Sequence, residues 1–307
     1  MFEIIFLGTS ASAPSIRRNL PALIVKHDEY RFLIDCGEGT QRQILQSGIG
    51  FKKLNRILIT HGHLDHILGL GGLLSTFMRW ESIDELEIIG GRLALERIAD
   101  LLHGVVLRGA EPPMPLYLRP IEDLSIFSDN QFSITAFPVQ HRGPDNFGFV
   151  FEEGGRRPFL PEKAEALNIP SGPMRRELVE GRPVQLPDGS TIHPDQVLGE
   201  YRPGVRLVII GDAGETSDLV DICSGADALI IEATYLEEEA EMARRFGHLT
   251  ARRAAELARQ ANVRQLILNH ISRRYREKDV LAEAQSIFEN AVVARDFDVF
   301  QIRRSEP

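Results

Sequence analysis

Short apolar runs, separated by small and polar residues, mark the first part of the chain. Residues 2–7 form such a run and predict a buried strand. Segments 22–26 and 30–34 flank a compact turn, which predicts a β-hairpin. Residues 41–47 have helical spacing and are followed by Gly48, a residue that commonly ends a helix. Strand and helix signals are therefore mixed from the start.

The same mixture continues to the end of the chain. Apolar runs predict further strands at 56–60, 87–89, 132–137, 147–152, 206–210, 228–231 and 265–268. Helical spacing predicts helices at 67–80, 251–260 and 280–290. Each half of the chain holds strands followed by helices. We therefore expect the α/β class, with two sheets packed face to face and covered by helices.

One segment interrupts this pattern. Seven prolines fall between Gly154 and Gly199, in a stretch that is rich in charge and poor in aromatic residues. Such a composition is typical of an insertion rather than of a sheet core. We expect a single domain over residues 1–307 that carries an inserted flexible arm at 152–199.

Composition narrows the class of protein. Of the 307 residues, 43% are hydrophobic and 26% are charged, which suits a globular protein with a sizeable core. The net charge of −9 argues against unspecific binding of nucleic acid over the whole surface. No apolar run approaches the ~20 residues of a membrane span, and the N-terminus lacks signal-peptide features. We expect a cytoplasmic protein with no membrane partner, and the two cysteines predict no disulfide framework.

A cluster of histidines follows the strand predicted at 56–60. His61, His63, Asp65 and His66 place three imidazoles and one carboxylate within six residues, although the chain has only nine histidines. Imidazole and carboxylate are the ligands that zinc prefers where thiolates are absent. The cluster therefore predicts a metal site.

Three more candidate ligands lie just past the ends of other predicted strands: His141, Asp212 and His270. Any one of them alone is more often a turn or capping residue. Their shared position, beside an existing cluster, favours a common site with enough ligands for two zinc ions. We assign His61, His63 and His141 to one ion, Asp65, His66 and His270 to the other, and Asp212 to both as a bridge.

At these residues the chain resembles the metallo-β-lactamase superfamily, whose HxHxDH signature is similar to residues 61–66, and within it the ribonuclease Z family. Other segments that resemble motifs of that family are 6–14, 35–41, 247–250 and 270–275. In the arm, residues 161–163, 171–173 and 178–181 resemble the segment with which the family grips tRNA. The similarity covers nearly the whole chain, in the family's order.

The resemblance implies a fold, a reaction and partners. The fold is an αββα sandwich with an inserted exosite arm. The reaction is cleavage of precursor tRNA after the discriminator base, with two zinc ions per subunit, or manganese in their place. The family is typically a homodimer in which the arm of one subunit presents tRNA to the active site of the other.

The resemblance and the residue types also suggest roles. Asp65 is expected to accept a proton from the attacking water as well as to bind metal. His248 is the candidate proton donor to the leaving oxygen, and Glu232 is its orienting partner. Candidate contacts to the RNA are Arg273, Arg274 and Tyr275, and in the arm Gly172 and Pro173.

The chain departs from the family pattern at two places. It has Gly69-Leu70-Gly71-Gly72 where Gly-Leu-Pro-Gly is frequent, and Ile231-Glu232-Ala233-Thr234 where His-Glu-Ala-Thr is frequent. The second departure removes an imidazole from the rim of the expected site.

Two other functions fit parts of this pattern. A small-ester hydrolase of the same fold, such as an arylsulfatase or phosphodiesterase, would share the metal site and not need the arm. A non-catalytic RNA-binding or scaffold protein would keep the fold, but degenerate members usually lose metal ligands, and here the ligand set is complete.

Overall fold

The computed structural model describes residues 1–80 and 83–304. The described part of the chain divides into two compact units. The main unit consists of Met1–Glu152 and Val205–Pro307, and the arm unit consists of Glu153–Gly204. The arm unit thus ends five residues beyond the segment that the prolines mark in the sequence.

The main unit has two sheets, each of seven strands when residues 1–80 and 83–304 are considered. The first sheet has the order β16 (Val299–Ile302), β1 (Phe2–Gly8), β2 (Ala22–His27), β3 (Tyr30–Ile34), β4 (Arg56–Leu58), β5 (Leu86–Gly90), β6 (Leu116–Pro120). The second has the order β15 (Ala291–Val293), β14 (Leu266–Asn269), β13 (Ala228–Glu232), β12 (Arg206–Ile209), β9 (Phe147–Glu153), β8 (Phe132–Pro138), β7 (Ser125–Ser128).

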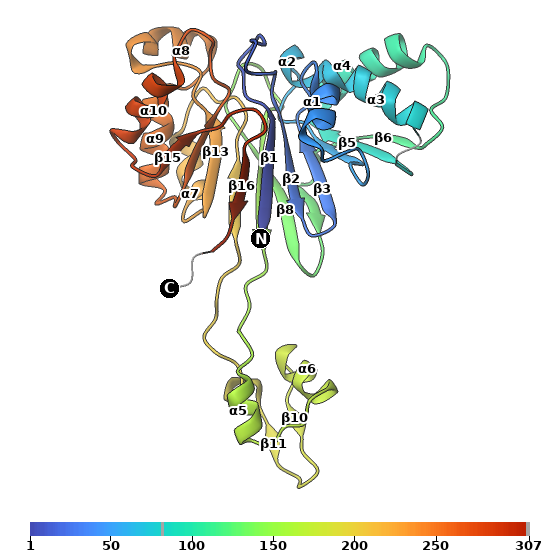
Figure 1. Cartoon of the computed structure of the whole chain (residues 1–307), viewed down its shortest axis with the longest axis vertical. Coiled ribbons are helices and arrows are strands. Elements are labelled where there is room, and N and C mark those ends of the chain that lie inside the picture. The colour runs from blue at the N-terminus through green and yellow to red at the C-terminus, as the bar shows by residue number, and fades with distance from the viewer. Residues whose placement is uncertain (81–82, 305–307) are drawn as a thin grey trace. The chain divides into compact units, whose positions relative to one another are not determined.

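Helices cover the outer face of each sheet (Figure 1). Over the first sheet lie α1 (Thr40–Ser47), α2 (Leu64–Ile67), α3 (Gly69–Trp80), α4 (Arg92–Ala99) and a π-helix (Asp100–Leu107). Over the second lie α7 (Val220–Cys223), α8 (Ala240–Phe246), α9 (Ala251–Gln260) and α10 (Glu277–Gln285). Short 3-10 helices span Ser217–Leu219 and Glu237–Glu239.

Three apolar clusters hold these layers together. Phe6 and Phe32 of the first sheet pack with Phe149 of the second in a core between the sheets. Ile44 of α1 belongs to the cluster under the helices of the first sheet, and Leu257 of α9 to the cluster under those of the second. The molecule is therefore the α/β sandwich, of αββα type, that the sequence predicts.

Most of the predicted elements are confirmed, with differences at their ends. The helix predicted at 251–260 has those bounds, and its N-terminus is capped because the Thr250 hydroxyl accepts from the Arg253 amide. The strand predicted at 56–60 ends at Leu58, since the Thr60 amide donates to the Asp35 side chain rather than to a neighbouring strand. The last helix spans Glu277–Gln285, earlier than the predicted 280–290.

The strand directions bring the loops of the site to one edge of the sandwich. β3, β4 and β5 run parallel in the first sheet, and β12, β13 and β14 run parallel in the second. β9 is antiparallel to β12. The loops after β4, β12 and β14 therefore leave at the carboxyl ends of parallel strands, where α/β proteins commonly place ligand sites.

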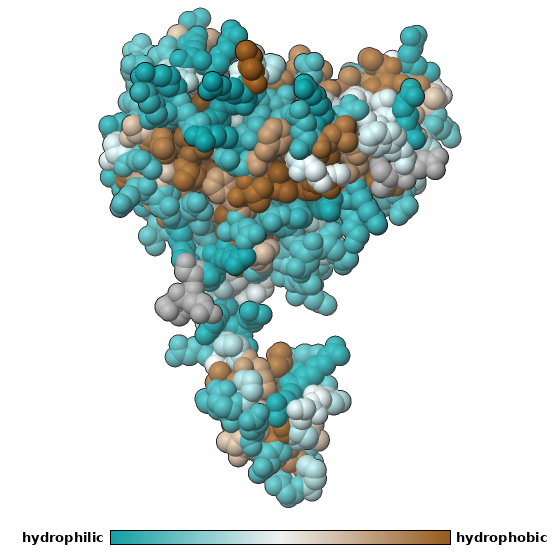
Figure 2. Space-filling model, viewed as in Figure 1, coloured by the Kyte–Doolittle hydropathy of each residue, from teal (hydrophilic) through white to brown (hydrophobic). Residues whose placement is uncertain are grey.

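The surface of the main unit carries both hydrophilic and apolar residues. On the face drawn in Figure 2, hydrophilic residues cover most of the main unit, and apolar residues gather in a band across its middle. No helix in the described part of the chain is long and apolar enough to cross a membrane.

The arm unit has a small core of its own. Its elements are α5 (Pro161–Ala166), α6 (Pro173–Val179), β10 (Val184–Gln185), β11 (Thr191–Ile192) and a 3-10 helix (Pro194–Gln196). β10 and β11 pair as an antiparallel hairpin. Leu178 of α6 is fully buried among apolar residues of the unit, which include Ile169 and Val197. Burial of this cluster stabilises the unit from within.

This core predicts a local effect of substitution. Leu178→Ala removes a fully buried side chain and should destabilise the arm unit by roughly 2–5 kcal/mol. Hydrogen exchange read by mass spectrometry should show lost protection within residues 153–204 and unchanged protection in β13 and β14. The matched control is Val179→Ala, since the neighbouring Val179 is 52% exposed. Equal loss of protection in both variants would contradict this account.

Candidate metal centre

Four loops carry the predicted ligands to one place. His61 and His63 lie in the loop after β4, and Asp65 and His66 belong to α2, which begins at Leu64. His141 follows β8, Asp212 follows β12, and His270 follows β14. All seven side chains of the sequence prediction therefore meet at the edge described above, in groups with ligand atoms no more than 4.8 Å apart.

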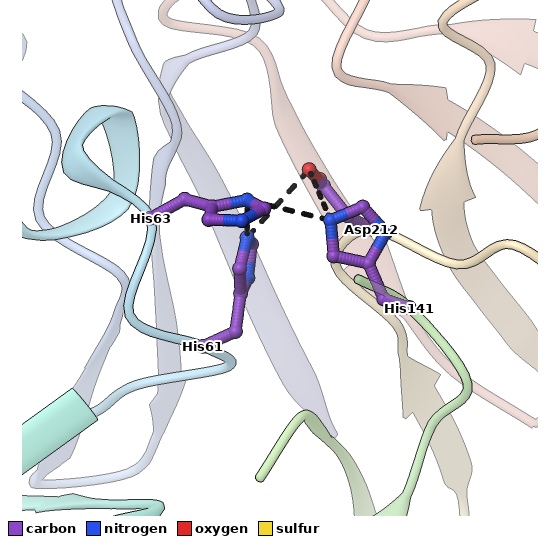
Figure 3. A group of neighbouring side chains, drawn as sticks. All are labelled: His61, His63, His141 and Asp212. Carbon is purple, nitrogen blue, oxygen red and sulfur yellow. Dashed lines mark hydrogen bonds and ion pairs between the residues drawn. The ribbon is translucent and has the colours of Figure 1, made fainter. Parts of the chain in front are cut away.

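The first group is His61, His63, His141 and Asp212, whose polar atoms point toward one another (Figure 3). His61 Nε2 lies 2.9 Å from His63 Nδ1, and His141 Nε2 lies 3.3 Å from the same atom. Asp212 Oδ2 closes the group at 3.7 Å from His61 Nε2 and 3.8 Å from His141 Nε2.

The second group is Asp65, His66 and His270. Asp65 Oδ2 lies 3.5 Å from His270 Nε2 and 3.7 Å from His66 Nε2. The other oxygen of Asp212, Oδ1, lies 3.4 Å from His270 Nε2 and 3.5 Å from His66 Nε2. Asp212 thus presents one oxygen to each group.

The geometry of the second group fits metal ions better than hydrogen bonds. His66 Nε2, His270 Nε2 and Asp212 Oδ1 are buried and have no hydrogen-bond partner among the described residues. Leaving such atoms unsatisfied is costly. Two ligands at 2.0–2.1 Å from a tetrahedral ion lie about 3.4 Å apart. The separations around Asp212 Oδ1 match that value, so these residues fit a divalent metal ion.

The outer nitrogens of His61, His141 and His270 are held by the protein. The Nδ1 atoms of His61 and His270 lie 3.0 and 2.9 Å from the hydroxyls of Thr60 and Thr234. His141 Nδ1 lies 2.6 Å from the Gly247 carbonyl oxygen. Such contacts fix the ring orientation and leave Nε2 for the metal.

Asp35 is a residue of the site to which the sequence analysis gave no role. Its carboxylate lies 2.8 Å from His66 Nδ1 and accepts hydrogen bonds from the Thr60 amide and hydroxyl. The position of Asp35 just after β3, the same signal that marked His141 and Asp212, could have identified it. Gly37 lets this loop approach α2, because an added Cβ would stand 2.5 Å from the Asp65 carbonyl oxygen.

The electrostatics of the site favour a positive charge at its centre. Burial lowers the pKa of His66, but the carboxylates of Asp212 and Asp35 outweigh burial and hold that pKa well above its ordinary value. Burial keeps the pKa of His61 well below its ordinary value. The carboxylates thus favour a cation, which a metal ion would supply when bound.

His248 and Glu232 form a pair beside this centre. His248 Nδ1 lies 3.0 and 3.1 Å from the two carboxylate oxygens of Glu232, which is almost fully buried. Burial opposes protonation of His248, yet the Glu232 carboxylate raises the His248 pKa to about 9. With Nδ1 held by Glu232, Nε2 of His248 is the nitrogen left to face a substrate.

The departure at Ile231 does not disturb this pair. Ile231 is fully buried in the apolar cluster between the second sheet and its helices. Glu232 itself is fixed by the Ala213 amide, which donates at 2.7 Å, and by the Thr234 hydroxyl. Thr234 also contacts His270, so Glu232 supports both His248 and, through Thr234, a candidate metal ligand.

The predicted RNA contacts do not gather in one place. Arg274 lines a hollow of about 470 Å³ together with Asp65, Asp212 and His248. Arg273 lies in a different hollow, formed with residues 14–17. The Tyr275 hydroxyl contacts Glu239, and its ring packs on the apolar cluster under α9.

The arm residues Gly172 and Pro173 lie at the start of α6. Gly172 precedes the helix with a φ of 122°, a conformation that favours glycine, and Pro173 is the first helical residue. The predicted contact of Gly172 and Pro173 with tRNA stays a prediction.

Comparisons with known proteins agree with this geometry. Residues 179–271 match the family described as Beta-lactamase superfamily domain, and residues 2–154 match the family described as Anti-Pycsar protein Apyc1. The crystal structure of human tRNase Z, short form, superposes with a TM-score of 0.69 and 26% identity, covering 98% of this chain and 100% of that chain.

Full-length relatives are closer in sequence. Ribonuclease Z of Archaeoglobus fulgidus is 40% identical over 100% of this chain and 99% of its own length. Ribonuclease Z of Bradyrhizobium diazoefficiens is 48% identical over 97% of this chain and 99% of its own length. With this similarity over its whole length, the chain belongs to the ribonuclease Z family of the metallo-β-lactamase superfamily.

Proposed function

We propose that this protein is a zinc-dependent endoribonuclease that removes 3′ trailers from precursor tRNA. It cuts after the discriminator base and leaves a 3′ hydroxyl on the tRNA. The observation that carries the proposal is the pairing of a seven-residue ligand set with the buried Glu232 and His248, in a chain 48% identical to a ribonuclease Z. A small-ester hydrolase would share the ligand set, but the full-length relatives named above are ribonucleases.

The proposed metal content is two zinc ions per subunit, with manganese as the alternative. His61, His63 and His141 would hold one ion, Asp65, His66 and His270 would hold the other, and Asp212 would contribute to both. Such a pair of ions lowers the pKa of water toward neutrality and stabilises charge on the oxygens of an in-line displacement at phosphorus.

The chain's own residues handle the protons. Asp65 is 16% exposed at its side chain and lines the hollow, so its carboxylate can take a proton from the attacking water. The Ser12 amide donates to Asp65 Oδ2 at 3.1 Å and keeps the carboxylate in place. On the other side, His248 gives a proton to the departing 3′ oxygen. Glu232 orients His248 and favours its protonated form.

The arm unit is proposed to hold tRNA away from the cut, through Gly172, Pro173 and their neighbours. Several of its arginines are occupied in ion pairs, such as Arg182 with Glu177 and Glu180. Lys163 has no ion pair among the described residues, so its ammonium is available to a phosphate, whereas the Arg175 guanidinium donates to the Ile169 carbonyl oxygen. In the main unit, Arg273, Arg274 and Tyr275 remain proposed contacts to RNA.

We also propose that the protein acts in the cytoplasm as a homodimer, with the arm of one subunit serving the active site of the other. The support for the dimer is the family resemblance stated above. Light scattering on the purified protein tests it directly, since a dimer has twice the mass of the 34.4 kDa chain.

The proposed metal centre predicts a stoichiometry. The purified protein should hold two zinc ions per chain, as measured by elemental mass spectrometry. Asp212→Asn removes the charge shared by both groups and should lower the content to one ion or fewer. The control is Asp221→Asn, which changes an exposed aspartate of α7 and should keep both ions. Equal zinc content in the two variants would refute the bridging role of Asp212.

The proton transfers predict the outcome of a cleavage assay. A labelled precursor tRNA with a 3′ trailer should be cut once, beside the discriminator, when products are mapped at nucleotide resolution. Asp65→Ala should abolish the cut, and His248→Ala should slow it about 10²–10⁴-fold. His103→Ala replaces an exposed histidine of the π-helix and should cut normally. A His248→Ala variant as fast as the control would rule out His248 as the proton donor.

The role of the arm predicts a split between substrates. β9 and β12 are antiparallel neighbours, with Glu152 opposite Arg206, so a short glycine–serine loop can replace residues 153–204. The shortened protein should lose tRNA cleavage while it still hydrolyses bis(p-nitrophenyl) phosphate, because all proposed metal ligands remain. Retention of tRNA cleavage would exclude the arm from substrate binding. Loss of both activities, with zinc content intact, would also contradict the proposal.

A further inference from the structure

Two arginines to which the proposed function gives no role line the mouth of the candidate metal centre. Arg97, from α4, and Arg142, from the loop after β8, border the same hollow as Asp65 and His248. Both side chains are exposed. Neither has a carboxylate partner among the residues that the structure describes, although the net charge of the chain is −9.

Neighbouring groups fix where these guanidiniums stand. Arg97 Nη1 donates to the Gly62 carbonyl oxygen at 2.7 Å, which ties it to the loop between His61 and His63. The glycine also lets α4 approach that loop, since a Cβ there would lie 3.0 Å from Ala94 Cα. Arg97 therefore belongs to the wall formed by the first sheet's ligand loop.

Arg142 borders a different part of the hollow, next to Phe246. Its guanidinium carbon lies 5.9 Å from the centre of the Phe246 ring, a cation–π distance. Gly247 makes room for its stem, because a Cβ at Gly247 would lie 2.9 Å from Arg142 Cγ. Phe246, Gly247 and His248 are consecutive, so Arg142 is placed beside the proposed proton donor.

The chemistry of these groups suggests their ligand. A guanidinium without a carboxylate partner matches the geometry of a phosphate oxygen pair and pairs with it strongly. By contrast, Arg274 in the same hollow is engaged with Glu239. Arg97 and Arg142 are thus the cations of this hollow that lack a carboxylate within the described residues.

We propose that Arg97 and Arg142 bind the two phosphates that flank the cleaved phosphate. The inference rests on the proposed ribonuclease function. Arg142 holds the phosphate on the 5′ side of the discriminator nucleoside, because that nucleoside carries the 3′ oxygen that leaves toward His248. Arg97, on the wall of the His61–His63 loop, holds the phosphate between the first two trailer nucleotides.

The test combines protein variants with neutral phosphates. Arg97→Gln and Arg142→Gln are compared on precursor tRNA with an ordinary phosphate or an uncharged methylphosphonate at either flanking position. The modified linkage is placed on a 2′-deoxy nucleoside, and the matching deoxy phosphodiester serves as reference. Arg259→Gln is the control, since Arg259 is an exposed arginine of α9 that does not border the hollow. Circular dichroism and zinc content confirm that each variant is folded.

On the reference RNA each of the two variants should lower kcat/KM about tenfold, mainly because KM rises. The slope of log KM against log salt concentration should fall by about one, as expected for the loss of one phosphate contact. The loss from Arg142→Gln should vanish when the phosphate 5′ of the discriminator is neutral, and the loss from Arg97→Gln should vanish when the first internal trailer phosphate is neutral.

The assignment would be overturned if the losses persist with both phosphates neutral. It would also be overturned if the loss from each variant vanishes with the phosphate assigned to the other arginine. Variants that cut like Arg259→Gln would also overturn it and leave the proposed function intact. A wild-type protein that makes no cut beside the discriminator would instead refute the proposed function.

Discussion

The buried carboxylate of Asp212 is the constraint on which the site depends. Its side chain is almost inaccessible, and within the described residues five imidazoles stand 3.4–3.8 Å from its oxygens: those of His61, His66, His141, His248 and His270. A buried charge needs a compensating charge or strong hydrogen bonds. Here the surrounding ring nitrogens are too distant from the carboxylate for good hydrogen bonds, and those of His66 and His270 lack a partner among the described residues. Metal ions between these groups would satisfy the carboxylate and the rings together.

The outer contacts explain how a site built from loops keeps its geometry. Thr60, Thr234 and the Gly247 carbonyl each hold the Nδ1 side of one imidazole. Asp35 and Glu232 stand behind them, the first bonded to Thr60 and the second to Thr234. The candidate ligands held in this way face the centre because hydrogen bonds behind them leave few other orientations. Glu232 also links this framework to His248, so the candidate proton donor and a candidate ligand share one support.

The candidate site could be predicted from the sequence where a short pattern of residues is typical of one kind of site. The dense run of His61, His63, Asp65 and His66 pointed to the candidate site, and the strand-end positions of His141, Asp212 and His270 pointed to side chains that lie with it. The end of β4 was harder to place, because the Thr60 amide donates to the Asp35 side chain instead of to a neighbouring strand. Asp35 received no role for a related reason. A single carboxylate after a strand has many uses: the position just after β3 can mark Asp35 as a candidate, and its approach to His66 defines the role.

The proposed RNA contacts were the part of the candidate site that was hardest to predict. Arg273, Arg274 and Tyr275 are adjacent in sequence, yet the turn after His270 sends Arg273 to one hollow and Arg274 to another. Arg97 and Arg142 lie far apart in sequence and meet only because α4 and the loop after β8 border the same hollow. Long-range packing of this kind leaves no local pattern in the chain.

The most direct test of the account is the position of the metal ions themselves. Crystals of the zinc-loaded protein, measured on both sides of the zinc absorption edge, should show two anomalous peaks per subunit. One peak should be bonded to His61, His63 and His141, the other to Asp65, His66 and His270, with one oxygen of Asp212 bonded to each at about 2.0–2.2 Å. A single peak, or two peaks of which only one contacts Asp212, would contradict the central role given to that carboxylate.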